Sequence, residues 1–413
     1  MFLRLGSSSF GGPVAHLGYF RSEFVLRRGW IGDRDYADLV ALCQILPGPA
    51  SSQVGFGIGL RRAGLPGALA AFLAFTLPSA LLMYMLSAGI QLLTGPVWSG
   101  ALLGLQAVAV AVVAQAVIGM ARTLTPDLGR ICIGLAALAA ALLWPGGPTQ
   151  LFVIVGGAAV GVWGCRHAAG TAFTRSGQAA GTGALGAPGP LPLGSAAHTS
   201  GGAFPVTRSA GIACLATLCL LLVVAAALGR SGGDGWLALV AASLRAGALV
   251  FGGGHVVLPL LHTEFVASGW VSQADFTAGY GVAQAMPGPL FSFAAYLGSL
   301  ASAGPGGAAG AALATLAIFT PGILLLLGAL PFWALLRASV AGNAAVLGAS
   351  AAVVGLLGAA LLHLVTVAAG DGAPALGLTL ACALALWLWR PPLWLVVLLA
   401  AAAGAGIGAL GLR

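Results

Sequence analysis

The hydrophobic pattern of this chain consists of long apolar runs separated by short polar links. Several runs reach or approach the roughly 20 residues that a helix needs to cross a bilayer. The pattern predicts an all-α polytopic integral membrane protein. Its intact spans are expected near residues 66–90, 97–120, 128–143, 149–164, 210–229, 306–329, 333–363, 374–389 and 393–410.

Two further apolar segments in the first half are interrupted by glycine and proline. Residues 2–20 contain Phe10-Gly11-Gly12-Pro13, and residues 36–60 contain Pro47-Gly48-Pro49. Proline removes a backbone donor and clashes with the preceding turn, so one helix cannot pass through these points unbroken. Backbone groups freed inside hydrocarbon are tolerated only where protein or a water-filled cavity satisfies them. We therefore expect functional helix breaks, with a merely structural kink as the alternative.

The interrupted segments occur a second time. Pro287-Gly288-Pro289 repeats Pro47-Gly48-Pro49, and Phe251-Gly252-Gly253-Gly254 aligns with Phe10-Gly11-Gly12-Pro13. Corresponding breaks in two halves of a chain point to a transporter's binding site. Other matches at a nearly constant offset are Glu264-Phe265-Val266 with Glu23-Phe24-Val25, Gly269-Trp270 with Gly29-Trp30, Asp275 with Asp35, and Thr320-Pro321-Gly322 with Leu77-Pro78-Ser79.

The duplication predicts a domain plan. The predicted parts are a first repeat at 1–164, a flexible low-complexity linker at 165–208, a linking transmembrane helix at 209–230 and a second repeat at 236–410. The linker is rich in Gly, Ala, Ser, Thr and Pro, which cannot bury enough surface to fold. The linking helix makes the number of crossings between repeat starts odd, so the second repeat should be inverted.

Arginine placement supports the inversion. The link between the first two broken segments holds Arg21, Arg27, Arg28 and Arg34, whereas the equivalent residues 262–275 hold none. The positive-inside rule expects this contrast when the two links lie on opposite sides. Re-entrant hairpins place nearly all loop arginines on one side, so we favour them over full crossings. Arms of about 10 residues would reach roughly 15 Å, and the tips would meet near the midplane.

Charge and cysteine content add little chemistry. All 17 basic residues are arginine and lie mainly between spans, so we interpret the net charge of +8 as topology signals and expect no nucleic-acid partner. The six cysteines form no C-x-x-C pair and are interpreted as packing residues.

Taken together, the motifs resemble the chromate ion transporter family. The residues that carry the resemblance are Phe10-Gly11-Gly12-Pro13-Val14-Ala15-His16-Leu17, Ala41-Leu42-Cys43-Gln44-Ile45-Leu46-Pro47-Gly48-Pro49-Ala50-Ser51-Ser52-Gln53, Phe251-Gly252-Gly253-Gly254-His255 and Met286-Pro287-Gly288-Pro289. The resemblance covers both halves and leaves out the linker. It implies an inner-membrane exporter of chromate, of the long type with two fused homologous domains. The segment before Phe2 is shorter than the family pattern, so we expect a short N-terminal piece to be missing.

Chromate is a tetrahedral dianion with four acceptor oxygens, so its site needs hydrogen-bond donors without a permanent deep charge that would trap it. Half-helix N-termini and glycine-rich turns present backbone N–H groups, and serine hydroxyls add donors. Helix packing is the alternative for the glycines, and a structural hydrogen bond is the alternative for the histidines. The candidate anion-binding residues are Gly11, Gly12, Pro13, His16, Pro47, Gly48, Pro49, Ser51, Ser52, Gly252, Gly253, Gly254, His255, Pro287, Gly288, Pro289 and Ser292.

Three charged residues are candidates for charge coupling: Glu23, Arg245 and Glu264. An arginine in an apolar run is costly, although snorkelling of Arg245 and simple pairing of the two acids with arginines are the alternatives. No Walker A motif, H-E-x-x-H motif or nucleophile elbow occurs, and the nine acidic residues are dispersed. We therefore expect no enzyme activity, metal or cofactor, and disfavour a membrane-embedded enzyme.

The predicted function is secondary or potential-driven export of chromate with chromate resistance. Transport of sulfate or another tetrahedral oxyanion is the alternative. The expected partners are that oxyanion and the lipid bilayer, and the expected location is the bacterial inner membrane. The sequence leaves open whether export is uniport or proton-coupled. It also leaves open whether the protein is a monomer or a homodimer.

Overall fold

The computed structural model describes residues 1–10, 12–92, 95–144, 147–164, 204–230, 235–250, 257–333, 335, 339–389 and 391–411. Every regular element in these ranges is a helix, which confirms the all-α prediction. Five of the described helices are long and apolar enough to cross a membrane, and shorter apolar helices accompany them. Of the predicted linker, residues 165–203 lie outside the described ranges.

The first half begins with two helical hairpins. Phe2 on the first arm stacks 4.7 Å from Phe24, and Leu39 lies against Gly57 across the second hairpin. Ala63 and Gly64 have non-helical backbone, so α4 consists of a short arm and a long helix joined at a kink. The elements are α1 (Phe2–Ser8), α2 (Gly12–Phe20), η1 (Arg21–Arg27), α3 (Asp33–Ile45), α4 (Ala50–Leu92), α5 (Pro96–Leu124), α6 (Leu128–Leu143) and α7 (Gly147–Gly164).

The second half has the same order of elements after the linking helix α9 (Arg208–Arg230). Its second hairpin closes through the Tyr296 hydroxyl, which donates to the Asp275 carbonyl at 3.0 Å. The elements are α10 (Trp236–Ala248), α11 (Val257–Leu261), η3 (His262–Val266), α12 (Gln273–Ala283), η4 (Leu290–Ser292), α13 (Phe293–Leu300), α14 (Gly307–Ala329), η5 (Leu330–Phe332), α16 (Val340–Gly370), α17 (Ala373–Leu388) and α18 (Leu393–Ala409).

Most intact helices occupy the predicted runs, and α16 is the clearest difference. It was expected at 333–363 but runs from Val340 to Gly370. The Ser339 side chain accepts a 3.0 Å hydrogen bond from the N–H of Gly342 and so caps the helix at a later start. The apolar run then carries the helix further toward the C-terminus than we predicted.

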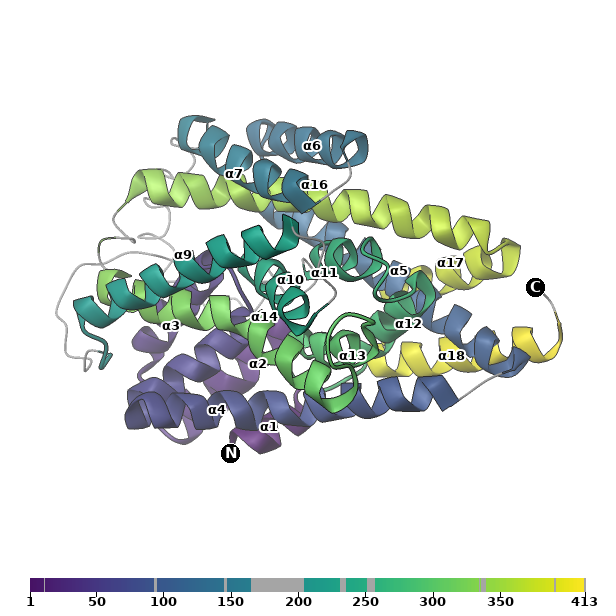
Figure 1. Ribbon diagram of the computed structural model, residues 1–413, viewed down its shortest axis with the longest axis horizontal. Coiled ribbons are helices and arrows are strands. Elements are labelled where there is room, and N and C mark those ends of the chain that lie inside the picture. Colours follow the sequence, from purple (N-terminus) through teal and green to yellow (C-terminus); the bar gives the residue numbers. More distant parts are fainter. Residues whose placement is uncertain are drawn as a thin grey trace.

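The terminal helices of each half pack on the other half. α6 and α7 lie on α16 at the top of Figure 1, while α17 and α18 pack on α5 at the right. Glycines bring these backbones together: a Cβ added to Gly104 would lie 2.0 Å from the Ala400 carbonyl oxygen. A Cβ on Gly348 would lie 2.1 Å from the Gly157 carbonyl oxygen. At these glycines helix packing explains the small residue.

Candidate functional site at the helix breaks

The two PGP turns connect the arms of the second hairpin in each half. Pro47-Gly48-Pro49 joins α3 to α4, and Pro287-Gly288-Pro289 joins α12 to η4. Gly48 has φ +124° and Gly288 has φ +94°, values that residues with a Cβ rarely adopt. The flanking prolines prevent either helix from continuing, so the chain must reverse here.

Each PGP turn forms a hydrogen bond with the other half of the chain. The N–H of Gly48 donates to the Val250 carbonyl at 2.7 Å, and the N–H of Gly288 donates to the Ser9 carbonyl at 2.9 Å. Val250 and Ser9 each directly precede a Phe-Gly-Gly sequence. We predicted that these two glycine N–H groups would donate to an anion. In the structure both N–H groups donate to backbone carbonyls instead.

Other backbone donors remain at the start of α4. The first intrahelical bond runs from the N–H of Gln53 to the Pro49 carbonyl at 2.9 Å. The N–H groups of Ala50, Ser51 and Ser52 precede it, so the helix itself gives them no acceptor. They carry the positive end of the helix dipole inside the protein, where Ser51 and Ser52 are both buried.

Each PGP turn also abuts a proline-containing helix of the other half. A Cβ on Gly48 would lie 2.9 Å from the Cα of Gly322 in α14, and one on Gly288 would lie 2.8 Å from Ser79 Oγ in α4. Gly322 follows Pro321, and Ser79 follows Pro78. Each turn therefore packs against the proline-containing helix of the other half: the Gly48 turn against α14, and the Gly288 turn against α4.

Gln53 binds the first turn to α14. Its side-chain Nε2 donates to the Gly322 carbonyl at 2.9 Å and to the Pro47 carbonyl at 3.2 Å. Gln53 was absent from the candidate residues predicted from sequence. The available signal was a lone amide side chain in the first turn of a long apolar helix.

His16 joins the first hairpin to the start of α4. Its Nε2 lies 3.2 Å from the Ser9 carbonyl, which can only accept, so Nε2 carries the hydrogen. In the neutral ring Nδ1 then accepts from the Ser51 hydroxyl at 3.3 Å. Both ring nitrogens and the Ser51 hydroxyl are therefore engaged within the protein.

Ser79, Thr76 and Ser292 form a second group of linked hydroxyl residues. The Ser79 hydroxyl donates to the Thr76 carbonyl at 3.0 Å. Its oxygen lies 2.6 Å from Ser292 Oγ, and because Ser79 has a single hydroxyl hydrogen, Ser292 is the donor of that bond. Thr76 and Ser79 were missed by the sequence analysis because serine and threonine are unremarkable in an apolar helix.

Several buried polar atoms near these turns have no hydrogen-bond partner among the described residues. They are the hydroxyls of Ser9, Ser52 and Thr76, the Oε1 atom of Gln53 and the Nε2 atom of Gln284. A buried polar group without a partner costs about 1–3 kcal/mol. Such groups occur mainly where a site is completed by a ligand or water.

The candidate charge-coupling residues all make ion pairs. Arg245 Nε donates to Glu264 Oε1 at 2.9 Å, and a second guanidinium nitrogen contacts Oε2 at 2.5 Å. Glu23 instead pairs with Arg28 at 2.7 Å and Arg27 at 3.2 Å. The hydrogen bond from Arg28, aided by Arg27, holds the pKa of Glu23 below its ordinary value.

The remaining predicted site residues fall at the glycine breaks. Gly12 and Pro13 lie in the first turn of α2, where Gly12 has φ +75°. The others of this group lie outside the described residues, namely Gly11, Gly252, Gly253, Gly254 and His255.

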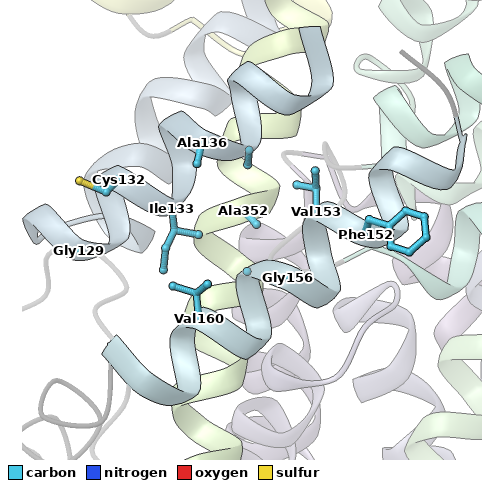
Figure 2. Close-up of a pocket in the computed structure, with 11 residues that line it drawn as sticks. Gly129, Cys132, Ile133, Ala136, Phe152, Val153, Gly156, Val160 and Ala352 are labelled. Atoms are coloured by element: carbon cyan, nitrogen blue, oxygen red, sulfur yellow. The ribbon is translucent and has the colours of Figure 1, made fainter. Parts of the chain in front are cut away.

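A crevice of about 360 Å³ lies elsewhere, between α6, α7 and α16. Figure 2 shows apolar side chains such as Ile133, Val153 and Val160 around it. A lining of this kind offers a dianion no strong donors, so the crevice is unsuited to bind an oxyanion.

The spanning helices, the paired interruptions and the buried polar groups between them are those of a multi-pass membrane transporter. The family model of the chromate transporter matches residues 1–162 and 237–405. The chain therefore belongs to the chromate transporter family, and it is a multi-pass protein of the bacterial inner membrane.

Individual relatives cover most of the chain. A chromate transport protein of Pseudomonas aeruginosa is 30% identical over 375 residues, which are 89% of this chain and 80% of the relative. A probable chromate transport protein of Synechococcus elongatus is 29% identical over 337 residues, 80% of this chain and 75% of the relative. A chromate transport protein of Cupriavidus metallidurans is 27% identical over 366 residues, 88% and 80% respectively. No solved structure matches the chain.

Proposed function

We propose that this protein exports chromate across the inner membrane and thereby confers chromate resistance. The convergence of the two interrupted hairpins on buried, uncharged donors carries the proposal. Two relatives are chromate transport proteins by name, and their similarity spans both halves of the chain. Sulfate, another tetrahedral dianion, needs the same donors and is the alternative substrate.

The anion binds where the hairpins converge. The start of α4 supplies N–H groups, and the hydroxyls of Ser9, Ser52 and Thr76 are buried without partners among the residues that the structure describes. Neutral donors stabilise a dianion while keeping the binding weak enough for release, which a transporter requires. The glycines at the turns lack a Cβ, which lets the turns approach the helices of the other half closely.

The domain plan is part of the proposal: two repeats of opposite topology, at 1–164 and 236–410, joined through 165–208 and a linking helix at 209–230. The reciprocal bonds from Gly48 to Val250 and from Gly288 to Ser9 support it. A two-fold relation between the halves produces such crossed contacts in pairs. Inverted repeats that meet at a central site also provide the alternating access that export needs.

The membrane potential supplies a driving force. A divalent anion that leaves a cell with a negative interior gains roughly 4.6 kcal/mol per 100 mV. Uniport is therefore sufficient for export, and Glu23, Arg245 and Glu264 are the charged residues to examine if protons are coupled.

A flux assay in proteoliposomes tests the proposal. The purified protein is reconstituted with chromate or sulfate inside, and efflux is followed under an imposed potential and, separately, an imposed pH gradient. We expect chromate efflux that increases when the compartment it leaves is made negative. Faster sulfate than chromate flux would favour the alternative substrate, and absence of flux for both anions would contradict the proposed function.

A further inference from the structure

The surroundings of the two PGP turns differ, although the duplication makes the turns equivalent. Beside Gly288 lie two hydrogen-bonded groups of polar residues, here together called the hydroxyl network: Ser9, His16 and Ser51 in one, and Thr76, Ser79 and Ser292 in the other. Alignment of the repeats relates most of them to apolar residues on the other side. Ser9 corresponds to Val250, His16 to Val257, Ser51 to Phe291, Thr76 to Phe319 and Ser79 to Gly322.

The Gly48 side is closed by aromatic packing. The ring of Phe319 lies 5.0 Å from that of Phe72 and 5.6 Å from that of Phe291. Phe291 and Phe319 are at most 1% exposed. Phenylalanine rings therefore stand where the Gly288 side has the hydroxyl groups of Thr76 and Ser51.

The amide of Gln53 makes the Gly48 side unfavourable for an anion. Both carbonyls that it binds, those of Pro47 and Gly322, engage its Nε2 donor. The atom left without a partner is Oε1, an acceptor that repels an oxyanion. The Gly48 turn is thus held against α14, and the Gln53 side chain places an acceptor atom beside it.

The Gly288 side has the opposite character. Ser9 and Thr76 are 1% and 3% exposed, and their hydroxyls have no partner in the described part of the chain. A hydroxyl group supplies one hydrogen, and a fully deprotonated oxyanion supplies only acceptors. An anion bound between Ser9 and Thr76 would therefore give each hydroxyl the acceptor that it lacks.

We propose that the oxyanion is held on the Gly288 side alone, by the hydroxyls of Ser9 and Thr76, while the Gly48 turn is a closed contact between the repeats. This inference rests on the proposed function and makes it more specific. It replaces two equivalent sites by one, built almost entirely from side chains of the first repeat.

Replacement of the free hydroxyls tests the inference. Thr76→Val and Ser9→Ala should each weaken chromate binding about tenfold or more, because each removes a hydrogen bond to a charged group. Binding is measured as KM in proteoliposomes and as chromate-dependent thermal stabilisation of the purified protein. Without chromate, both variants should unfold at the wild-type temperature or higher, since the hydroxyls lost had no partner.

A matched control separates binding from helix packing. Thr315→Val makes the same chemical change in α14, where the buried hydroxyl donates to the Ala311 carbonyl at 2.7 Å. It should leave chromate binding at the wild-type level and should not raise the unfolding temperature.

Two results would overturn the single-site inference. One is wild-type chromate affinity in both Thr76→Val and Ser9→Ala. The other is a tenfold loss of affinity in Gln53→Leu with an unchanged unfolding temperature, which would place the anion at the Gly48 turn. If the wild-type protein neither binds nor transports chromate or sulfate, the proposed function fails as well, and that outcome is distinct from unaffected variants of an active transporter.

Discussion

The backbone N–H of Gly288 donates to the carbonyl of Ser9, so the second PGP turn is held by the residue that precedes the first glycine break. Gly48 and Val250 form the counterpart of this bond. Any movement of one repeat relative to the other must lengthen or replace these two bonds. The turns are therefore the places where a change in the packing of the halves reaches the candidate site directly.

Large side chains at the turns should block transport. In Gly288→Leu the new side chain would meet Ser79 Oγ and the Gly6 carbonyl, and in Gly48→Leu it would meet Gly322. Both substitutions also force a strained φ, at a cost of about 1–3 kcal/mol. We expect loss of chromate flux from protein that still inserts in the membrane.

Gly119→Leu is the control, because no atom of the described residues lies within 4 Å of a Cβ there. Normal flux in either turn variant would reduce the turns to simple kinks.

The ion pair between Arg245 and Glu264 should be strongly coupled. The two side chains are only 24% and 16% exposed, so a lone charge left by Arg245→Gln or Glu264→Gln is poorly solvated. A double-mutant cycle measured by thermal or denaturant unfolding should give a coupling of about 1–3 kcal/mol. The exposed pair of Arg21 and Asp33 is the control and should give about 0–1 kcal/mol. A coupling near zero for Arg245 and Glu264 would show that the pair is incidental.

The inverted arrangement predicts opposite exposure of two equivalent links. Arg27 and Ser268 both lie at exposed ends of hairpins. Single cysteines at these positions, in a background without other cysteines, should react with a membrane-impermeant thiol reagent from opposite sides of the membrane. Labelling of intact spheroplasts and inverted vesicles measures this. Reaction of both cysteines from one side would exclude inverted repeats.

The linker should be replaceable. Residues 170–205 show no periodicity and no motif, and they have the composition of a flexible chain. About 15 Gly/Ser residues have an r.m.s. reach of about 20 Å, enough to join neighbouring helix ends. We expect near-normal chromate flux when residues 170–205 are replaced by about 15 Gly/Ser residues. Reduced flux at normal membrane abundance would mean that the natural segment binds or gates something.

The sequence by itself determined where helices form and where they break. Hydrophobic length fixes the spans, and proline acts on its own turn, so the interruptions at Pro47 and Pro287 could be located without knowledge of any neighbour. Glycine at the turns was readable for the same local reason. The repeat of both motifs pointed to a transporter, and the similarity to chromate transport proteins agrees with it.

Only the tertiary structure decided which donors are available. The N–H groups of Gly48 and Gly288 look free in the sequence, but they are engaged by carbonyls from the other half. Ser292 and Thr76 look alike as hydroxyl residues in apolar helices, yet the Ser292 hydroxyl is engaged and the Thr76 hydroxyl has no partner in the described ranges. A hydrogen bond between distant segments depends on packing that brings them within about 3 Å, and no local pattern encodes that distance.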